Sequence, residues 1–246
     1  MVATWVLEGM GIDLVQYLGL YYPASEHFRL HQIFTHMFMH GGFMHIFFNM
    51  FALWMFGRVL ESVWGSKRFL MYYLITGIGA AALHTFVNYL HISAMQNALD
   101  AYINTPSPEL LDHFVQKYLS QPSSQVIDFV NSWYNTPTNG SFAAEGQRLM
   151  ERIVQMNINI PTVGASGAIF GILLAFGMLF PNTQLMLIFP PIPIKAKYFV
   201  MGYGALELYL GLTQPGSNIA HFAHLGGMLF GFFLIKYWNK NTKNFY

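Results

Sequence analysis

The fold is indicated first by a long apolar stretch near the start of the chain, Ile33–Leu60, which reads IFTHMFMHGGFMHIFFNMFALWMFGRVL. About 20 predominantly apolar residues are enough to cross a lipid bilayer as a helix. This stretch also contains His36, His40, His45 and Asn49. Ionisable residues inside a membrane helix are costly and mark candidate functional sites. We therefore expect a membrane helix that carries part of a site.

The composition of the whole chain agrees with a membrane protein. Of its 246 residues, 54% are hydrophobic and 9% are charged, whereas about a quarter of the residues in a soluble domain are charged. The net charge of +1 gives no reason to expect nucleic acid as a partner. The chain has no cysteine, which excludes disulfides, thiolate metal sites and a cysteine nucleophile. The lipid bilayer is therefore the expected environment.

Other apolar stretches complete a bundle of membrane helices. They are Phe69–Leu90, Val163–Phe180, Ala196–Leu212 and Ile219–Trp238. A shorter stretch, Val2–Met10, is interrupted by Glu8 and is expected to be the end of a first helix that is truncated here. The sequence thus predicts an all-α polytopic membrane protein whose first span is incomplete.

Residues 93–161 differ from these spans because they contain acidic residues, prolines, serines and asparagines. Ser107, followed by proline and glutamate, predicts a helix start. A second helix is expected to begin at Ser123 or Ser124, and a third is expected over Phe142–Met156. We interpret this region as a helical extramembrane insertion between the third and fourth spans. It is either a packed cap over the membrane domain, which we favour, or a surface that docks substrates.

The basic residues orient the spans. Eight of the twelve lysines and arginines fall on one side of the bilayer if the spans alternate. These eight are Arg58, Lys67, Arg68, Lys195, Lys197, Lys236, Lys240 and Lys243. The positive-inside rule makes that side cytoplasmic. The expected parts are then residues 1–92 with the first three spans, 93–161 as an extracytoplasmic insertion, 162–238 with the last three spans, and 239–246 as a cytoplasmic tail.

A serine opens the fourth expected span in the motif GASG, residues 164–167. Small residues at such a position usually serve the close packing of membrane helices. The alternative is that Ser166 is a nucleophile, which needs a base within hydrogen-bond reach. Taken alone, the motif favours the packing interpretation.

A histidine motif lies in the last span, where residues 220–231 read AHFAHLGGMLFG. His224, Gly227 and Gly231 are spaced i, i+3 and i+7 and share one helix face. The two glycines allow another backbone to approach closely at the level of the histidine. His221 is the competing base, but it lacks this pair of glycines and suits a neutral histidine bonded to a neighbouring helix. We therefore choose His224.

A metal site is the rival interpretation of the histidines. His36 and His40 are spaced i, i+4 and could chelate a metal in a transporter. Acidic partners for a divalent cation are scarce, because Glu61 and Glu207 are the only carboxylates clearly within or beside the expected spans. This scarcity of carboxylates weakens the metal interpretation.

The polar residues of three spans are expected at a similar depth on one side of the bilayer. Ser166 and His224 lie just inside the outer ends of their spans, and His45 and Asn49 lie in the outer half of theirs. One site could then contain a nucleophile, a base and donors to an oxyanion. No aspartate or glutamate is expected at that depth, so the sequence predicts a Ser-His dyad rather than a triad.

Three motifs, in this order and spacing, resemble those of the rhomboid family of intramembrane serine proteases. They are HMFMHGGFMHIFFNM (36–50), GASG (164–167) and AHLGGMLFG (223–231). The resemblance implies a rhomboid-like six-helix bundle in which Ser166 attacks the scissile carbonyl and His224 accepts its proton. It also implies that His45, Asn49 and the backbone N–H of Ser166 stabilise the oxyanion.

The resemblance assigns supporting roles to further residues. Gly164 and Gly167 would belong to the backbone of the serine motif, and Phe170 would pack against the histidine ring. Gly227 with Gly231 would let the sixth helix meet the fourth.

The resemblance also implies a substrate class and a location. The substrates would be proteins with a transmembrane helix, cleaved without a metal or cofactor. We expect an integral multi-pass protein of a bacterial cytoplasmic (inner) membrane, with its active site open to the extracytoplasmic side. The alternative is a non-catalytic rhomboid-like protein that binds transmembrane clients. The sequence predicts neither the physiological substrate nor the oligomeric state.

Overall fold

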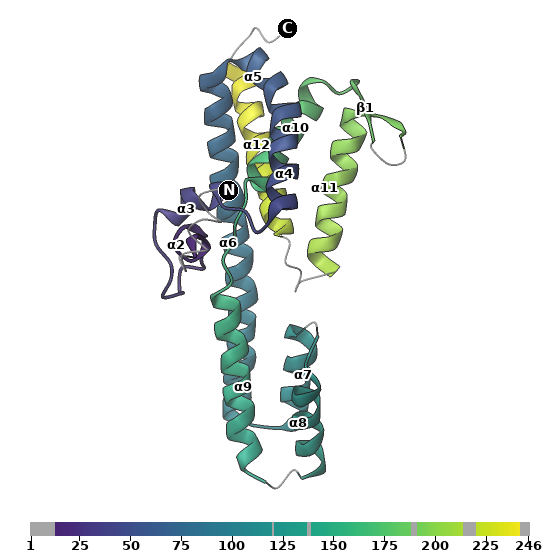
Figure 1. The fold of residues 1–246 in the computed structure, drawn as a ribbon. Helices are drawn as coiled ribbons and strands as arrows, with labels where there is room; N and C mark the ends of the chain where they lie inside the picture. The colour runs from purple at the N-terminus through teal and green to yellow at the C-terminus, as the bar shows by residue number, and fades with distance from the viewer. Residues whose placement is uncertain (1–12, 120, 137–138, 188–190, 214–219, 242–246) are drawn as a thin grey trace. The chain divides into compact units, whose positions relative to one another are not determined.

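The computed structural model describes residues 13–119, 121–136, 139–187, 191–213 and 220–241, and its regular structure is mainly helical (Figure 1). The elements before the long central helix are α2 (Leu14–Leu18), α3 (Gln32–Thr35), the 3₁₀ turn η1 (His36–Phe38), α4 (Phe43–Ala52), the π-helical turn η2 (Leu53–Gly57) and α5 (Arg58–Trp64). The later ones are α6 (Ser66–Asn104), α7 (Pro108–Tyr118), α8 (Ser124–Asn135), α9 (Ser141–Ile158), α10 (Ser166–Leu179), α11 (Ala196–Thr213) and α12 (His221–Asn241). An antiparallel pair, β1 (Gln184–Met186) and β2 (Pro193–Lys195), precedes α11. The expected all-α fold is confirmed.

The chain forms two compact units. The first comprises the residues up to Tyr21, His27–Thr85 and the residues from Pro161 onward. The second comprises Tyr22–Glu26 and Phe86–Ile160. The helix α6 contributes its first part to one unit and its last part to the other.

The helix α10 is the centre of the first unit. Ten of its 14 residues are buried, as expected of a helix that is apolar on all sides. Its glycines bring neighbouring helices close, because Gly171 lies against Thr76 of α6 and Gly177 lies against Val200 of α11. A short helix at this position is therefore enclosed by the longer ones.

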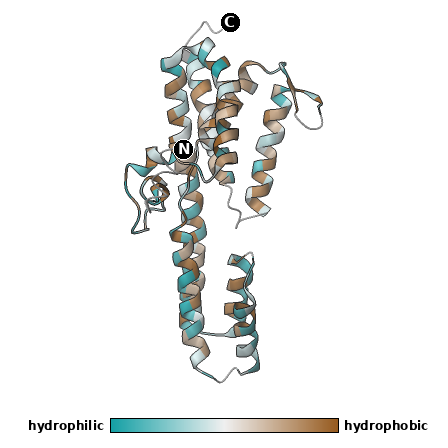
Figure 2. Cartoon of the chain, viewed as in Figure 1, coloured by the Kyte–Doolittle hydropathy of each residue, from teal (hydrophilic) through white to brown (hydrophobic). Residues whose placement is uncertain are grey.

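The helices of the first unit also expose many large apolar side chains. Phe43, Phe47 and Phe51 stack along one face of α4, with ring centroids 6.2 Å apart in each successive pair, and all three are exposed. Figure 2 shows apolar residues along α4 and α11. Within the described residues, the helical segments Phe43–Trp64 and Ser66–Asn104 are long and apolar enough to cross a membrane. Exposed apolar faces of this extent indicate contact with lipid or with a partner.

The second unit is built from amphipathic helices, which mix polar and apolar residues in Figure 2. Ser107 caps α7 by accepting a hydrogen bond from the backbone N–H of Leu110, and Ser123 caps α8 in the same way through Val126. Tyr102 and Trp133 are buried in its core. The helix starts predicted from the two serines are confirmed.

Two predicted boundaries are wrong. The second span was expected from Ile33, but α4 begins at Phe43 because Gly41 and Gly42 interrupt the helix, and glycine disfavours helix interiors. The third span was expected to end at Leu90, but α6 runs on to Asn104. The residues beyond Leu90 contain neither proline nor glycine before that end, so nothing stops the helix.

Candidate active site

The loop before α10 is held at two points. Leu20 and Thr162 exchange two backbone hydrogen bonds of 2.9 and 2.8 Å. The backbone N–H of Gly164 donates to the carbonyl of His36 at 2.9 Å. Gly164 has a φ of 124°, which favours glycine over other residues. The chain is thereby turned so that Ser166 becomes the first residue of α10.

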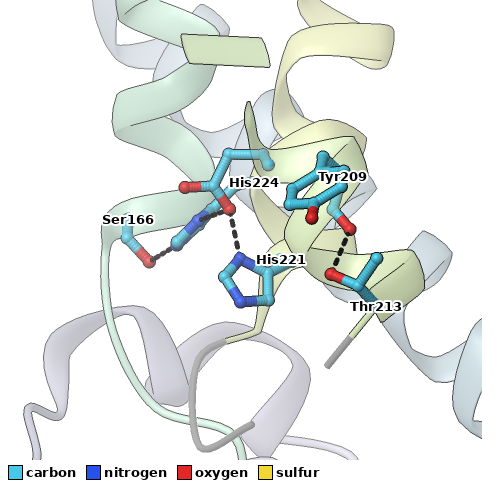
Figure 3. Close-up of polar contacts among 6 residues, drawn as sticks. Ser166, Tyr209, Thr213, His221 and His224 are labelled. Carbon is cyan, nitrogen blue, oxygen red and sulfur yellow. Dashed lines mark hydrogen bonds and ion pairs between the residues drawn. The ribbon is translucent and has the colours of Figure 1, made fainter. Parts of the chain in front are cut away.

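Ser166 faces a histidine from the last helix, as Figure 3 shows. The hydroxyl Oγ of Ser166 lies 2.8 Å from Nε2 of His224. Ser166 is half-buried and His224 is buried. The structure thus brings together the serine and the histidine that the sequence analysis selected, with the serine the more accessible of the two.

The ring of His224 is held by stacking. Phe170, one turn along α10 from Ser166, lies parallel to the imidazole with ring centroids 4.2 Å apart and an interplanar angle of 3°. Tyr203 of α11 stacks on Phe170 in turn, with centroids 5.1 Å apart. Aromatic rings in contact prefer particular relative orientations, so this stack favours the observed orientation of the imidazole. Phe170 therefore occupies the position against the histidine that was expected of it.

A carboxylate lies at the other ring nitrogen of His224, and this contact corrects the sequence analysis. Oε2 of Glu207 lies 2.9 Å from Nδ1 of His224 and 2.6 Å from Nδ1 of His221. Glu207 is 5% exposed. The prediction that no acidic residue lies at the depth of the histidine is wrong. Because α11 and α12 are consecutive and pack together, the C-terminal half of α11 faces the first turn of α12.

The proton positions follow from these contacts. A carboxylate accepts hydrogen bonds, so Nδ1 of His224 carries a proton and donates to Glu207. In a neutral imidazole the other nitrogen is then unprotonated, and Nε2 accepts the hydroxyl proton of Ser166. This is the tautomer that a general base needs in order to activate a serine.

The predicted oxyanion residues lie on α4. The Nδ1 atom of His45 accepts the backbone N–H of Gly41 at 3.3 Å, so the proton of a neutral ring is on Nε2. That Nε2 lies beside Gly164, since a Cβ at Gly164 would be 2.7 Å from it. Asn49 is buried, and its Nδ2 donates to the carbonyl of His45 at 2.7 Å. The ring of His45 thus lies beside the serine loop, whereas this hydrogen bond of Asn49 stays within α4.

Two glycines of α12 permit close packing, but against different helices. A Cβ on Gly227 would collide with the carbonyl of Gly167 on α10. A Cβ on Gly231 would collide with the hydroxyl of Tyr72 on α6, and that hydroxyl donates to the carbonyl of Gly171 on α10 at 2.8 Å. Gly227 therefore lies against the fourth span as expected, whereas Gly231 lies against Tyr72, whose hydroxyl bonds to that span.

The histidines proposed for a metal do not form a helical pair. His36 is in η1 and buried, with Nδ1 bonded to the carbonyl of Gln32 at 2.9 Å, whereas His40 lies in the link before α4. Another group, Glu207 with His221 and His224, has ligand atoms within 4.8 Å of one another and could hold a metal. Ligand atoms about 2.0–2.1 Å from a tetrahedral zinc lie roughly 3.3 Å apart. The distances of 2.6 and 2.9 Å are those of hydrogen bonds instead.

Comparisons with known proteins agree with these motifs. The profile of the Rhomboid domain family matches residues 27–99 and 115–240. The chain is 23% identical over 194 residues to Rhomboid protein 1, mitochondrial, of Saccharomyces cerevisiae, covering 79% of this chain and 38% of that protein. It is 26% identical over 201 residues to RHOMBOID-like protein 12, mitochondrial, of Arabidopsis thaliana, covering 81% of this chain and 44% of that protein.

The chain spans less than half the length of these two relatives. Both are described as mitochondrial proteins of eukaryotes. The comparisons therefore give no support to the expected bacterial cytoplasmic membrane.

Proposed function

This chain belongs to the rhomboid family, and from that premise we propose that it is an integral membrane protein that acts as a serine endopeptidase. In this proposal Ser166 is the nucleophile and His224 is the general base. The substrates are membrane proteins, cleaved in or near a transmembrane helix. The observation that carries the proposal is the 2.8 Å contact between Oγ of Ser166 and Nε2 of His224.

The proposed reaction begins at the hydroxyl of Ser166. Its oxygen attacks the scissile carbonyl while Nε2 of His224 takes its proton. The imidazolium then gives that proton to the leaving amine, and an acyl-enzyme remains. A water molecule, deprotonated by the same nitrogen, then attacks the acyl carbon; the ester bond breaks, Nε2 returns the proton to Oγ of Ser166, and the second product leaves as a carboxylic acid.

The negative charge of each tetrahedral intermediate needs donors aimed at it. The backbone N–H of Ser166 is one proposed donor, because the first N–H groups of a helix have no partner within the helix. Nε2–H of His45 is the second, since that nitrogen lies beside Gly164. Asn49 is the third, with the N–H that does not donate to the carbonyl of His45. The positive end of the α10 dipole favours the same charge.

The alternative is a non-catalytic member of the family that binds transmembrane clients. A protein of that kind has no need of an activated serine. The paired Ser166 and His224 and the rings that hold the histidine favour the protease.

The test is cleavage of a single-span membrane reporter in liposomes. The wild-type chain is compared with Ser166→Ala, His224→Ala and His221→Ala. We expect the first two changes to abolish cleavage and the third to retain it, reduced by about tenfold or less, because Nε2 of His224 meets the hydroxyl of Ser166, whereas His221 bonds to Glu207. A fluorophosphonate, which labels an activated serine, supplies a second readout.

The outcomes separate the mechanisms. Cleavage that persists in Ser166→Ala would exclude this serine as the nucleophile. A loss in His221→Ala as complete as that in His224→Ala would contradict the choice of base. Binding of the reporter by wild type without cleavage or labelling would favour the client-binding alternative.

A further inference from the structure

We propose that Glu207 is a positioning residue for the base, so that the site works as a Ser-His-Glu triad rather than as a dyad. The inference rests on the proposed function, because it concerns the reaction of Ser166. It starts from the line of contacts that runs from the hydroxyl of Ser166 through His224 to Oε2 of Glu207, with donor–acceptor distances of 2.8 and 2.9 Å.

The carboxylate fixes the tautomer of the base. A free neutral imidazole carries its proton on either nitrogen, and only the form protonated at Nδ1 can accept a proton from Ser166 at Nε2. The acceptor at Nδ1 selects that form. When His224 becomes an imidazolium, the adjacent negative charge stabilises it.

Glu207 is buried, and its charge acts on the adjacent ring of His224. The residue is 5% exposed and lies within α11, whose sequence is otherwise free of acidic residues. A charged side chain in such a place is costly unless it is paired and hydrogen-bonded. The two imidazole N–H groups supply those hydrogen bonds.

His221 holds the carboxylate in place. Its Nδ1 donates to the same oxygen, Oε2, that accepts from His224. The two rings are perpendicular, with centroids 6.4 Å apart. Since each ring approaches that oxygen from its own direction, His221 limits the positions that Oε2 can take in front of His224.

The test replaces the charge and keeps the shape. Glu207→Gln retains an amide of the same size, but its NH₂ group can face Nδ1 and favour the wrong tautomer. Glu207→Asp restores the charge on a side chain that is shorter by one methylene. Glu61→Gln is the matched control, because Glu61 is a half-buried carboxylate on α5 that has no part in the site. Each full-length variant is measured in liposomes for kcat, KM, the rate of fluorophosphonate labelling and thermal stability.

We expect Glu207→Gln to lower kcat on the order of 10,000-fold, the loss found when the acid of a serine triad is removed or neutralised. The KM should stay within about threefold, because the carboxylate does not touch the substrate. The labelling rate should fall together with kcat. Glu207→Asp should recover at least about tenfold of the loss, and Glu61→Gln should match wild type. A purely structural role would lower thermal stability without this separation of kcat from KM.

Several results would overturn the inference. If Ser166→Ala is inactive but Glu207→Gln keeps kcat within about threefold of wild type, the proposed function stands and the role of Glu207 falls. An equal loss in Glu61→Gln would also overturn it. Activity that disappears with a chelator and returns with Zn²⁺ would make the cluster a metal site instead. A wild-type chain without cleavage or labelling would remove the proposed function and this inference with it.

Discussion

At the scale of single residues, the site depends on how each polar side chain is held. His224 has its ring against Phe170 and a hydrogen-bond partner at each nitrogen. Ser166 owes its position to the loop before it, which is bonded at Gly164 to the carbonyl of His36. His36, a buried histidine in η1, thus supports the nucleophile through its backbone carbonyl. This role does not require contact with a substrate.

Gly164 offers a test of this loop. We expect Gly164→Ala to reduce cleavage strongly and to destabilise the protein by about 1–3 kcal/mol, the usual cost of a strained backbone conformation. Its φ of 124° disfavours alanine, and the new methyl would lie 2.7 Å from Nε2 of His45. Reporter cleavage and thermal unfolding are the measurements. The control is Gly140→Ala, where a methyl meets nothing within 4 Å. Full activity in Gly164→Ala would show that the loop adapts and that this turn is dispensable.

At the scale of elements, apolar length and capping residues predicted most helices. The start of α7 followed from Ser107 and its proline, because a cap is a local interaction. The contact of Glu207 with His224 was not predicted, since it depends on the rotation of α11 about its axis relative to α12. The signal available was the acidic residue inside an otherwise apolar helix, which needs a partner. In the structure that partner is supplied by His221 and His224 at the start of the next helix.

The packing of α12 against α10 can be tested at a glycine. We expect Gly227→Ala to separate the two helices and to destabilise the protein by about 1–3 kcal/mol, as overpacking usually does. The added Cβ would collide with the carbonyl of Gly167, the residue after Ser166. Because His224 is on α12 and Ser166 is on α10, cleavage should fall more than stability alone explains. Gly202→Ala on α11, where a methyl meets nothing within 4 Å, is the control. Wild-type kcat in Gly227→Ala would contradict this close contact.

At the scale of the whole molecule, the sequence indicates a membrane environment, but it does not indicate where every membrane helix begins and ends. The exposed phenylalanines of α4 and the apolar helices Phe43–Trp64 and Ser66–Asn104 fit lipid contact. The apolar stretch Val163–Phe180 was expected to be a span, and the helix α10 within it has 14 residues, most of them buried. A helix enclosed by others can be shorter than the length rule requires, because that rule describes a helix that meets lipid alone.

The sidedness of the chain is a prediction that labelling can test. If basic residues mark one face of the membrane, the alternation of the expected spans predicts that Ser66 and Asn182 lie near that face and that Gln125 of the expected insertion lies on the opposite side. The chain contains no cysteine, so single substitutions of these exposed residues by cysteine each report alone. In sealed vesicles, a membrane-impermeant maleimide should label Gln125→Cys from one side, and Ser66→Cys and Asn182→Cys from the other. Retained reporter cleavage is the control for folding. Labelling of all three from the same side would contradict the alternating spans, and with them the proposal that the site opens on the face opposite the basic residues.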